Sequence, residues 1–284
     1  MWRFGLRQGA QLALGLAGAI LLAAMVAAAD DARAGAGAFL HALLAHLGSF
    51  LHLDFGTSTI SGESALAELS ARLPVTLELA GLGGIVALLI GAPLGILLGT
   101  ERPLRAGAPL IQIVAAIPVF CVGLALMWLA ANVLHWPEHG ASQFARILQT
   151  LALPALTVGA AGAAIVQLSL RRAAAEAMDE PYRRGLRLMG LSAFDINTVF
   201  LVPQILAGLL RSLGEITLAL FSAAAVAEWL FGWPGAAVLF LKSVALHDWN
   251  VAALVLLVFA AIKMIADFAG IVGARALSIQ EPRA

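Results

Sequence analysis

The sequence predicts an all-α, polytopic membrane protein with about six transmembrane helices. Of its 284 residues, 61% are hydrophobic and only 12% are charged, whereas a soluble domain is typically about 45–50% apolar. Six separate apolar stretches each approach or exceed the roughly 20 residues that a helix needs to cross a bilayer. The formal net charge of zero and the single cysteine give no indication of nucleic-acid binding and exclude an intramolecular disulfide.

The six apolar stretches are 10–29, 74–99, 108–134, 151–170, 200–231 and 251–272. Arg3 and Arg7 precede the first stretch, which also fits a cleaved signal peptide. Its apolar part is about 20 residues long, however, and a signal core has about 7–15. We therefore expect the first stretch to be a retained helix.

The whole chain, residues 1–284, is predicted to form one transmembrane domain. Residues 1–29 carry the first span, and residues 30–72 form an external region with an interfacial helix. Residues 73–284 form a five-span core, which includes a cytoplasmic loop at about 176–199. No part of the chain is left over for a soluble domain.

The basic residues predict the orientation, because cytoplasmic loops of membrane proteins carry an excess of Lys and Arg. With alternating spans and a cytoplasmic N-terminus, four basic residues lie outside: Arg33, Arg72, Arg146 and Lys242. Eleven lie inside: Arg3, Arg7, Arg102, Arg105, Arg171, Arg172, Arg183, Arg184, Arg187, Arg275 and Arg283. This asymmetry predicts that both termini are cytoplasmic.

A short helix is predicted within the cytoplasmic loop, in the stretch "DEPYRRGLRLMG" (179–190). Asp179 is a suitable N-cap, and Pro181 suits the first turn. Gly190 suits the C′ position that ends a helix. Ser192 then opens "SAFD", which resembles the capping box of a following helix.

One face of this short helix is apolar, because Tyr182, Leu186 and Met189 follow each other at i, i+4 and i+7. The remaining surface carries arginines: Arg183, Arg184 and Arg187. Two interpretations stay open. The helix lies on anionic lipid head groups, or its apolar face docks into a groove on a soluble partner.

The same segment resembles the "EAA" loop of bacterial ABC importer permeases. In that loop a glycine is followed, after nine residues, by I-x-L-P, and here Gly190 is followed by Phe200-Leu201-Val202-Pro203. The peptide/nickel branch of these permeases has a longer pattern, D-Y-x-R-x-A-R-A-K-G-L-S. The chain matches it at Tyr182, Arg184, Arg187, Gly190, Leu191 and Ser192, and departs from it at Pro181, Leu186 and Met189.

Further segments resemble that branch in the same order along the chain. They are "LDFGTS" (53–58), "RLPVTLELA" (72–80), "GAPLGILLG", "IPVFCVGLAL", "LALPALTVG", "AEWLFGWPG" (227–235), which matches E-x-x-F-x-W-P-G, and "EPR" (281–283). The external region before "LDFGTS" is shorter than in the branch, and Gly208 stands where the branch has a proline.

The resemblance implies a permease subunit of a type I ABC importer in the bacterial inner membrane. Its implied partners are a second, homologous permease in a heterodimer, two cytoplasmic ATPase subunits and an external substrate-binding protein. Peptides or peptide-like solutes are the leading substrate class, followed by nickel chelates or another small solute. Coupling to the ATPases is expected at the cytoplasmic loop, through Tyr182, Arg183, Arg184, Leu186, Arg187, Met189 and Gly190.

The residues predict no catalytic chemistry and no cofactor. A P-loop requires Gly-Lys followed by Ser or Thr, but the two lysines, Lys242 and Lys263, follow Leu241 and Ile262. ATP hydrolysis is therefore expected on other subunits. An intramembrane hydrolase is disfavoured, because no histidine lies centrally in a predicted span.

Two charge pairs lie inside predicted spans at i, i+4 spacing. They are Arg211 with Glu215 in the fifth span and Lys263 with Asp267 in the sixth. Charges at membrane depth are costly and usually face the bundle interior or water. In one interpretation, the two charges of each pair neutralise each other. In the second, Arg211 and Glu215 line the translocation path. In the third, the protein is an ion-coupled secondary transporter that uses both pairs as proton or ion relays.

The histidines do not predict a metal site. His41, His46 and His52 lie in an apolar stretch with helical period, which favours an interfacial helix outside the membrane. Their spacings of five and six residues do not place them on one helix face. His135 and His139 are separated by Pro137 and are assigned to a loop.

Overall fold

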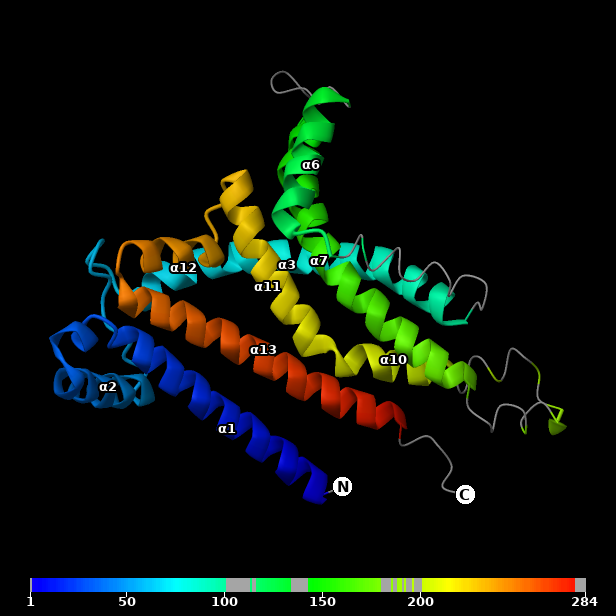
Figure 1. Cartoon of the computed structure of the whole chain (residues 1–284), viewed down its shortest axis with the longest axis horizontal. Coiled ribbons are helices and arrows are strands. Elements are labelled where there is room, and N and C mark those ends of the chain that lie inside the picture. Colours follow the sequence, from blue (N-terminus) through cyan, green and yellow to red (C-terminus); the bar gives the residue numbers. More distant parts are fainter. Residues whose placement is uncertain are drawn as a thin grey trace. The chain divides into compact units, whose positions relative to one another are not determined.

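The computed structural model describes residues 2–100, 113, 116–133, 143–179, 185, 188–190, 192, 196 and 201–278. In these residues the regular structure is helical, apart from one isolated β-bridge between Thr57 and Ser64. The all-α prediction is confirmed. The helices are α1 (Trp2–Ala27), η1 (Asp31–Ala34), α2 (Ala36–Leu51), α3 (Ala65–Thr100), α6 (Val119–Asn132), α7 (Gln143–Asp179), α10 (Val202–Arg211), α11 (Leu213–Phe231), α12 (Ala236–Ala245) and α13 (Trp249–Ser278) (Figure 1).

Five of the described helices are long and apolar enough to cross a membrane: Arg7–Ala27, Ala65–Thr100, Thr150–Met178, Leu213–Phe231 and Trp249–Leu277. They correspond to the first, second, fourth, fifth and sixth predicted spans. The third predicted span, 108–134, is described mainly through the 14 residues of α6. Residues 101–112 lie outside the described part of the chain.

The fifth predicted span, 200–231, is wrong in one respect, because it is not one helix. Ser212 leaves the helical conformation with φ −94° and ψ 4°, which separates α10 from α11. The Ser212 hydroxyl donates to the carbonyl oxygen of Gly208 at 3.0 Å. Such bonds from serine to the preceding turn often bend helices. The 19 residues of α11 then suffice to span the membrane.

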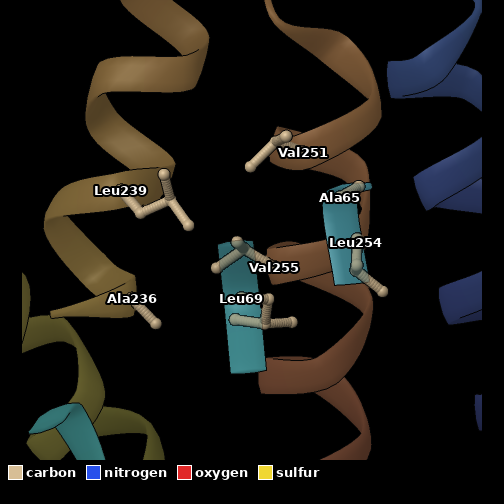
Figure 2. Packing of buried hydrophobic residues seen from close by; sticks show 7 residues of the cluster. All are labelled: Ala65, Leu69, Ala236, Leu239, Val251, Leu254 and Val255. Carbon is tan, nitrogen blue, oxygen red and sulfur yellow. The ribbon is translucent and has the colours of Figure 1, made fainter. Parts of the chain in front are cut away.

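The chain divides into two compact units, and the boundary between them passes within α3, α11 and α13. Unit 1 comprises Met1–Leu79 and Ala224–Ile265, and unit 2 comprises Ala80–Ala223 and Ala266–Ala284. One core of unit 1 joins the start of α3 to α12 and α13 (Figure 2). Its buried members are Ala65, Leu69, Ala236, Leu239, Val251, Leu254 and Val255.

A second core of unit 1 joins α1 to α2, the helix that was predicted within the external region. Phe50 of α2 packs with Ala23, Ala24 and Ala27 of α1 and with Ala253 of α13. The small alanine side chains let the helices approach closely, and Phe50 fills the remaining space at 3% exposure. The opposite face of α2 leaves Leu40, Leu44 and Leu51 exposed.

In unit 2, α3 and α7 pack with almost no side chain between their backbones. Gly91, Gly95 and Gly99 of α3 lie against the carbonyl oxygens of residues 163, 167 and 171 of α7. A Cβ atom added to any of the three glycines would come within 2.7 Å of the facing oxygen. Such small-residue contacts are typical of closely packed membrane helices. We call this contact of Gly91, Gly95 and Gly99 with α7 the glycine seam. It holds α3 and α7 together in the unit that also contains α10 and the start of α11.

Candidate functional site

The described part of the predicted cytoplasmic helix is its end. Met189 donates its backbone N–H to the carbonyl oxygen of Gly185 at 3.0 Å, which closes a helical turn. Gly190 follows with φ +84°, a conformation that costs other residues about 1–2 kcal/mol. This supports the prediction of Gly190 as a helix-ending residue. Tyr182, Arg183, Arg184, Leu186 and Arg187 lie outside the described residues.

Two large apolar side chains are exposed at this helix end. Leu188 is 84% exposed and Met189 is 73% exposed. The predicted apolar face contained Met189 but not Leu188. Exposed neighbouring apolar side chains favour contact with another surface, because their burial is worth roughly 1.5–3 kcal/mol each.

Helix α10 follows the loop and is anchored on α7. Pro203 lies in its first turn, where the missing N–H costs no hydrogen bond. Ile205 and Ala207 are buried. Gly208 contacts Ala173 of α7 so closely that a Cβ atom would overlap the Ala173 side chain. A movement of the loop would therefore reach α10 directly and α7 through this contact.

Arg211 and Glu215 lie on two different helices, contrary to the expected i, i+4 pair. Arg211 is the last residue of α10, and Glu215 lies in the first turn of α11. Both side chains are exposed, and no ion pair joins these two described residues. Each charge has a favourable position on its own helix, because cations suit helix C-termini and anions suit N-termini.

Asp267 of α13 faces the same junction. Its carboxyl group lies against Gly214 in the first turn of α11, where any added side chain would overlap it. One turn further along α13, Gly270 lies against the carbonyl group of Leu210. The start of α11 therefore has two acidic residues close to its N-terminal end, Glu215 and Asp267, in a region that favours negative charge.

The sequence reasoning did not single out Glu228, which is fully buried at the end of α11. The Thr76 hydroxyl of α3 donates to Glu228 Oε1 at 2.6 Å. The backbone N–H of Val238 donates to Oε2 at 2.7 Å. Thr76 also accepts the N–H of Ala236 at 2.7 Å. Together these groups satisfy backbone donors at the start of α12, which an isolated helix leaves unpaired.

The residues after Glu228 turn the chain back onto its carboxyl group. Trp233 donates its N–H to the backbone carbonyl of Glu228 at 2.8 Å, and Gly232 has φ +72°. At Gly235, the N-cap of α12, any side chain would overlap the Glu228 carboxyl group. These contacts explain why E-x-x-F-x-W-P-G combines a glutamate with a final glycine. Glu228 is the only charged residue in the stretch 216–231, and this isolated charge was the sequence signal that could have found the network.

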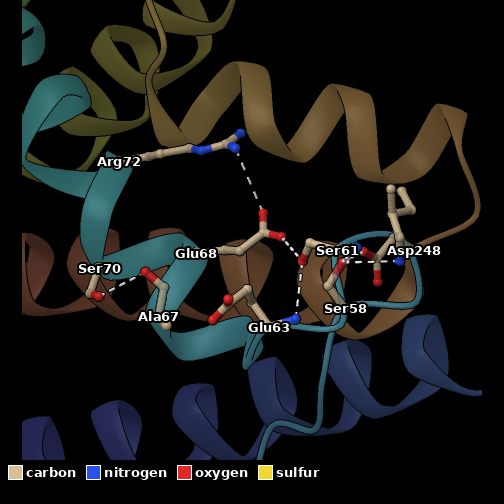
Figure 3. Close-up of polar contacts among 9 residues, drawn as sticks. Ser58, Ser61, Glu63, Ala67, Glu68, Ser70, Arg72 and Asp248 are labelled. Atoms are coloured by element: carbon tan, nitrogen blue, oxygen red, sulfur yellow. Dashed lines mark hydrogen bonds and ion pairs between the residues drawn. The ribbon is translucent and has the colours of Figure 1, made fainter.

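A second network holds the "LDFGTS" segment of the predicted external region (Figure 3). The Ser58 hydroxyl donates to Asp248 Oδ2 at 2.5 Å, and the Thr59 N–H donates to Oδ1 at 3.3 Å. Asn250 donates its side-chain amide to the Thr57 carbonyl at 3.0 Å. Ser58 and Asp248 are 3% and 2% exposed. The segment is therefore fastened to the turn that precedes α13.

The described histidines do not assemble a site. The ring of His46 lies 6.1 Å from the ring of Phe50, within the packing of α2. Among the described residues, no group of three His, Cys, Asp or Glu side chains could hold a metal ion. His135 and His139 lie outside the described residues.

Comparison with known proteins assigns the family. The sequence profile of the family described as "Binding-protein-dependent transport system inner membrane component" matches residues 88–278, more than half of the chain. The chain belongs to this family. In this inner membrane component, the match includes the predicted cytoplasmic loop, the α10–α11 junction and Glu228, whereas its partner Thr76 lies before the matched range.

Several curated relatives of this transport component are similar to the chain. It is 32% identical over 220 residues to the probable D,D-dipeptide transport system permease protein DdpB of Escherichia coli (strain K12), covering 67% of the chain and 64% of that protein. It is 30% identical over 202 residues to the glutathione transport system permease protein GsiC of Salmonella choleraesuis (strain SC-B67), covering 70% and 65%. The chain thus spans a little under two thirds of both relatives.

A third relative is more distant but is covered over a larger share. The dipeptide transport system permease protein DppB of Lactococcus lactis subsp. cremoris (strain MG1363) is 26% identical over 229 residues, covering 78% of the chain and 73% of that protein. All three matches fall on permease proteins whose names specify dipeptide or glutathione transport. The inner-membrane assignment agrees with the five long apolar helices.

Proposed function

We propose that the chain is a transmembrane permease subunit of an ATP-driven ABC importer and forms half of a translocation path for peptides or peptide-like solutes. The observation that carries this proposal is the family match over residues 88–278. The names of the relatives, which specify dipeptides and glutathione, support the solute class.

The family description names a binding-protein-dependent system, which supports an external substrate-binding protein as one part of the proposed importer. Its partners are a second homologous permease in a heterodimer, two cytoplasmic ATPase subunits and an external substrate-binding protein. Both termini lie in the cytoplasm, as the arginine asymmetry favours. ATP is bound and hydrolysed on the ATPase subunits.

The short helix that ends at Gly190, within the predicted cytoplasmic loop, couples the permease to an ATPase subunit. The exposed side chains of Leu188 and Met189 support this role, because they offer apolar surface beside a well-defined helix end. Tyr182, Arg183, Arg184, Leu186 and Arg187 complete the docking helix. Its movement reaches α10 and, through the contact of Gly208 with Ala173, also α7.

Arg211 and Glu215 line the translocation path. Both are exposed and lie on either side of the break between α10 and α11. Opposite charges on separate helices offer contacts for the amino and carboxyl termini of a peptide. The absence of an ion pair between these two described residues leaves their charges available.

The test is to purify the chain in mild detergent with the subunits encoded beside it, and to reconstitute the complex in proteoliposomes. The expected result is ATP-dependent uptake of a radiolabelled di- or tripeptide that requires the binding protein. Uptake of a nickel chelate instead of peptide would support the alternative solute. Uptake driven by a proton gradient without ATPase subunits would contradict the proposal and support an ion-coupled transporter.

A further inference from the structure

A movement of the coupling helix reaches α10, but the chain interrupts its helical course at Ser212 before α11 begins. The Ser212 hydroxyl donates to the carbonyl oxygen of Gly208 at 3.0 Å, on the α10 side of the break. On the other side, the Ile216 N–H donates to the carbonyl oxygen of Ser212 at 2.9 Å and begins the hydrogen-bond ladder of α11. Two helices joined through one non-helical residue can change their angle unless other contacts hold them.

Asp267 of α13 supplies such a contact at the start of α11. A Cβ atom added to Gly214, the second residue of α11, would lie 1.7 Å from Asp267 Oδ1 and 2.9 Å from Oδ2. The carboxyl group therefore reaches the α11 backbone because residue 214 has no side chain. The first N–H groups of a helix have no partner within it, and a carboxylate is well suited to them as an acceptor and as a negative charge. Asp267 thus stands where an N-capping side chain of α11 would stand, although it belongs to another helix.

The same face of α13 also contacts the end of α10. Gly270 follows Asp267 at i+3, and a Cβ atom added to it would lie 2.1 Å from the carbonyl oxygen of Leu210 and 3.2 Å from Cβ of Leu213. At Gly273, a Cβ atom would meet the flexible side chain of Leu210 at 3.2 Å or more. All of these residues belong to unit 2. One helix therefore holds both sides of the break, with Asp267 against α11 and Gly270 against α10.

Neutralisation by Lys263 does not account for this placement. Lys263 precedes Asp267 by four residues on α13, which allows a pair on one helix face. Such a pair would not require a glycine at position 214. A charged residue within a membrane-crossing helix is costly and commonly has a function. The contact with Gly214 indicates what that function is for Asp267.

We propose that Asp267 is a positioning residue of the importer, which fixes the angle between α10 and α11 together with Gly270. A movement of α10, driven by an ATPase subunit through the coupling helix, then carries the first turn of α11 and Glu215 with it. Without the carboxyl group, the break at Ser212 would absorb this movement. The inference rests on the proposed function and adds the residue that transmits movement to the translocation path.

The angle between the two helices can be measured in the complete importer with spin labels on α10 and α11. Leu206→Cys and Leu218→Cys suit this purpose because both leucines are exposed, in a Cys121→Ala background with the reactive cysteines of the partner subunits replaced. Double electron–electron resonance should give one narrow distance distribution. Asp267→Ala should broaden it, because loss of a helix cap shifts the balance toward a loose junction by roughly 2- to 30-fold. Asp267→Asn should keep it narrow, because asparagine caps helices about as well as aspartate.

Glycine variants test the contact from the other side. Gly214→Ala should broaden the distribution, because the new methyl group overlaps Asp267 Oδ1 and must displace it. Alanine otherwise favours a helix over glycine, so a weaker helix cannot explain this result. Gly273→Ala is the matched control on the same face of α13 and should leave the distribution narrow, because the Leu210 side chain can make room. Broadening in Lys263→Ala equal to that in Asp267→Ala would show that the pair with Lys263 holds the junction, which would overturn the inference.

The functional readout is the number of peptides taken up per ATP hydrolysed in proteoliposomes. Asp267→Ala and Gly214→Ala should lower this ratio at least about 2-fold while ATP hydrolysis continues. Asp267→Asn and Gly273→Ala should keep the wild-type ratio. A purely structural defect would reduce uptake and hydrolysis together and leave the ratio unchanged. A wild-type ratio in Asp267→Ala, or a distance distribution as narrow as that of the wild type, would overturn the inference.

The failures of the two proposals are distinguishable. If the wild-type importer takes up no peptide, the proposed function is wrong, and the spin-label distances still test whether Asp267 holds the junction, because they require no transported solute. If wild-type uptake is normal while Asp267→Ala and Gly214→Ala behave like Gly273→Ala, the proposed function stands and only the positioning role is wrong.

Discussion

The hydroxyl group of Thr76 lies 2.6 Å from Glu228 Oε1, although the two residues are 152 positions apart in the chain. This bond ties α3 to the end of α11. Through Ala236 and Val238, the same two side chains also hold the start of α12. A fully buried carboxyl group is thus satisfied by donors from two separate parts of unit 1, Thr76 of α3 and Val238 of α12.

Loss of this network should destabilise unit 1. We expect Thr76→Val to reduce stability by about 1–3 kcal/mol, because it leaves buried polar groups without a partner. Glu228→Leu should be more damaging than Glu228→Gln, which keeps one acceptor for the Val238 N–H. The midpoint of thermal unfolding in detergent, followed by tryptophan fluorescence, measures the change. Thr157→Val is the control, and an equal loss of stability there would contradict the prediction.

The "LDFGTS" segment should loosen without its serine. Ser58→Ala removes the bond to Asp248 and the acceptor for the N–H groups of Ile60 and Ser61. We expect faster hydrogen exchange in residues 57–62, measured by mass spectrometry. Ser70→Ala is the matched control, because Ser70 is exposed and bonds only to the carbonyl of Ala67 in its own helix. Unchanged exchange in Ser58→Ala would show that the backbone turn alone holds the segment.

Gly190→Val should impair coupling between ATP hydrolysis and uptake. A β-branched residue resists the observed φ of +84°, so the helix end should reorganise. The mutant should reach the membrane but lose ATPase subunits or hydrolyse ATP without transport. Gly185→Val is the control, because Gly185 does not have this conformation and a Cβ atom there meets no neighbour within 4 Å. Equal coupling in the two mutants would reduce the segment to a lipid-surface element.

Arg211→Ala and Glu215→Ala should each lower peptide uptake without preventing assembly of the complex. Because the two residues lie on different helices without a shared ion pair, their effects should be nearly additive. A double-mutant cycle on kcat/KM should give a coupling below about 0.5 kcal/mol. A larger coupling would restore the paired interpretation, and normal uptake in both single mutants would exclude a role in the path.

The orientation is tested by cysteines at Ser142 and Ser192 in a Cys121→Ala background. Ser142 lies in a predicted external loop and Ser192 in the predicted cytoplasmic loop. A membrane-impermeant thiol reagent should label Ser142→Cys on intact cells and Ser192→Cys only after permeabilisation. Labelling of Ser192→Cys from outside would contradict the arginine asymmetry.

Sequence reasoning predicted the features that depend on local chemistry. The length of the apolar stretches located the spans, because a segment that crosses lipid must pair its backbone polar groups internally and therefore forms a long helix. Gly190 was predicted as a helix end because only glycine adopts positive φ without steric cost, and its φ of +84° agrees. Met189 was predicted on an apolar face with Tyr182 and Leu186, and this face stays a prediction because those two residues lie outside the described part of the chain.

The features that sequence reasoning missed depend on distant partners. The spacing of Arg211 and Glu215 fits one helix, whereas the break at Ser212 occurs beside the bond from Ser212 to Gly208 and the packing of Gly270 against Leu210. Glu228 has no charged neighbour in the sequence, and its partner Thr76 lies on another helix.

The glycine seam between α3 and α7 restricts how these two helices can move. Gly91, Gly95 and Gly99 and the facing carbonyl groups both repeat every four residues. A shift of one helical turn would restore two of the three contacts, whereas a smaller shift would move the glycines away from the facing carbonyl groups and bring residues with side chains toward the α7 backbone. We therefore expect any sliding to be stepwise and this part of the two helices to move together. Chemical crosslinks between them should be compatible with repeated turnover.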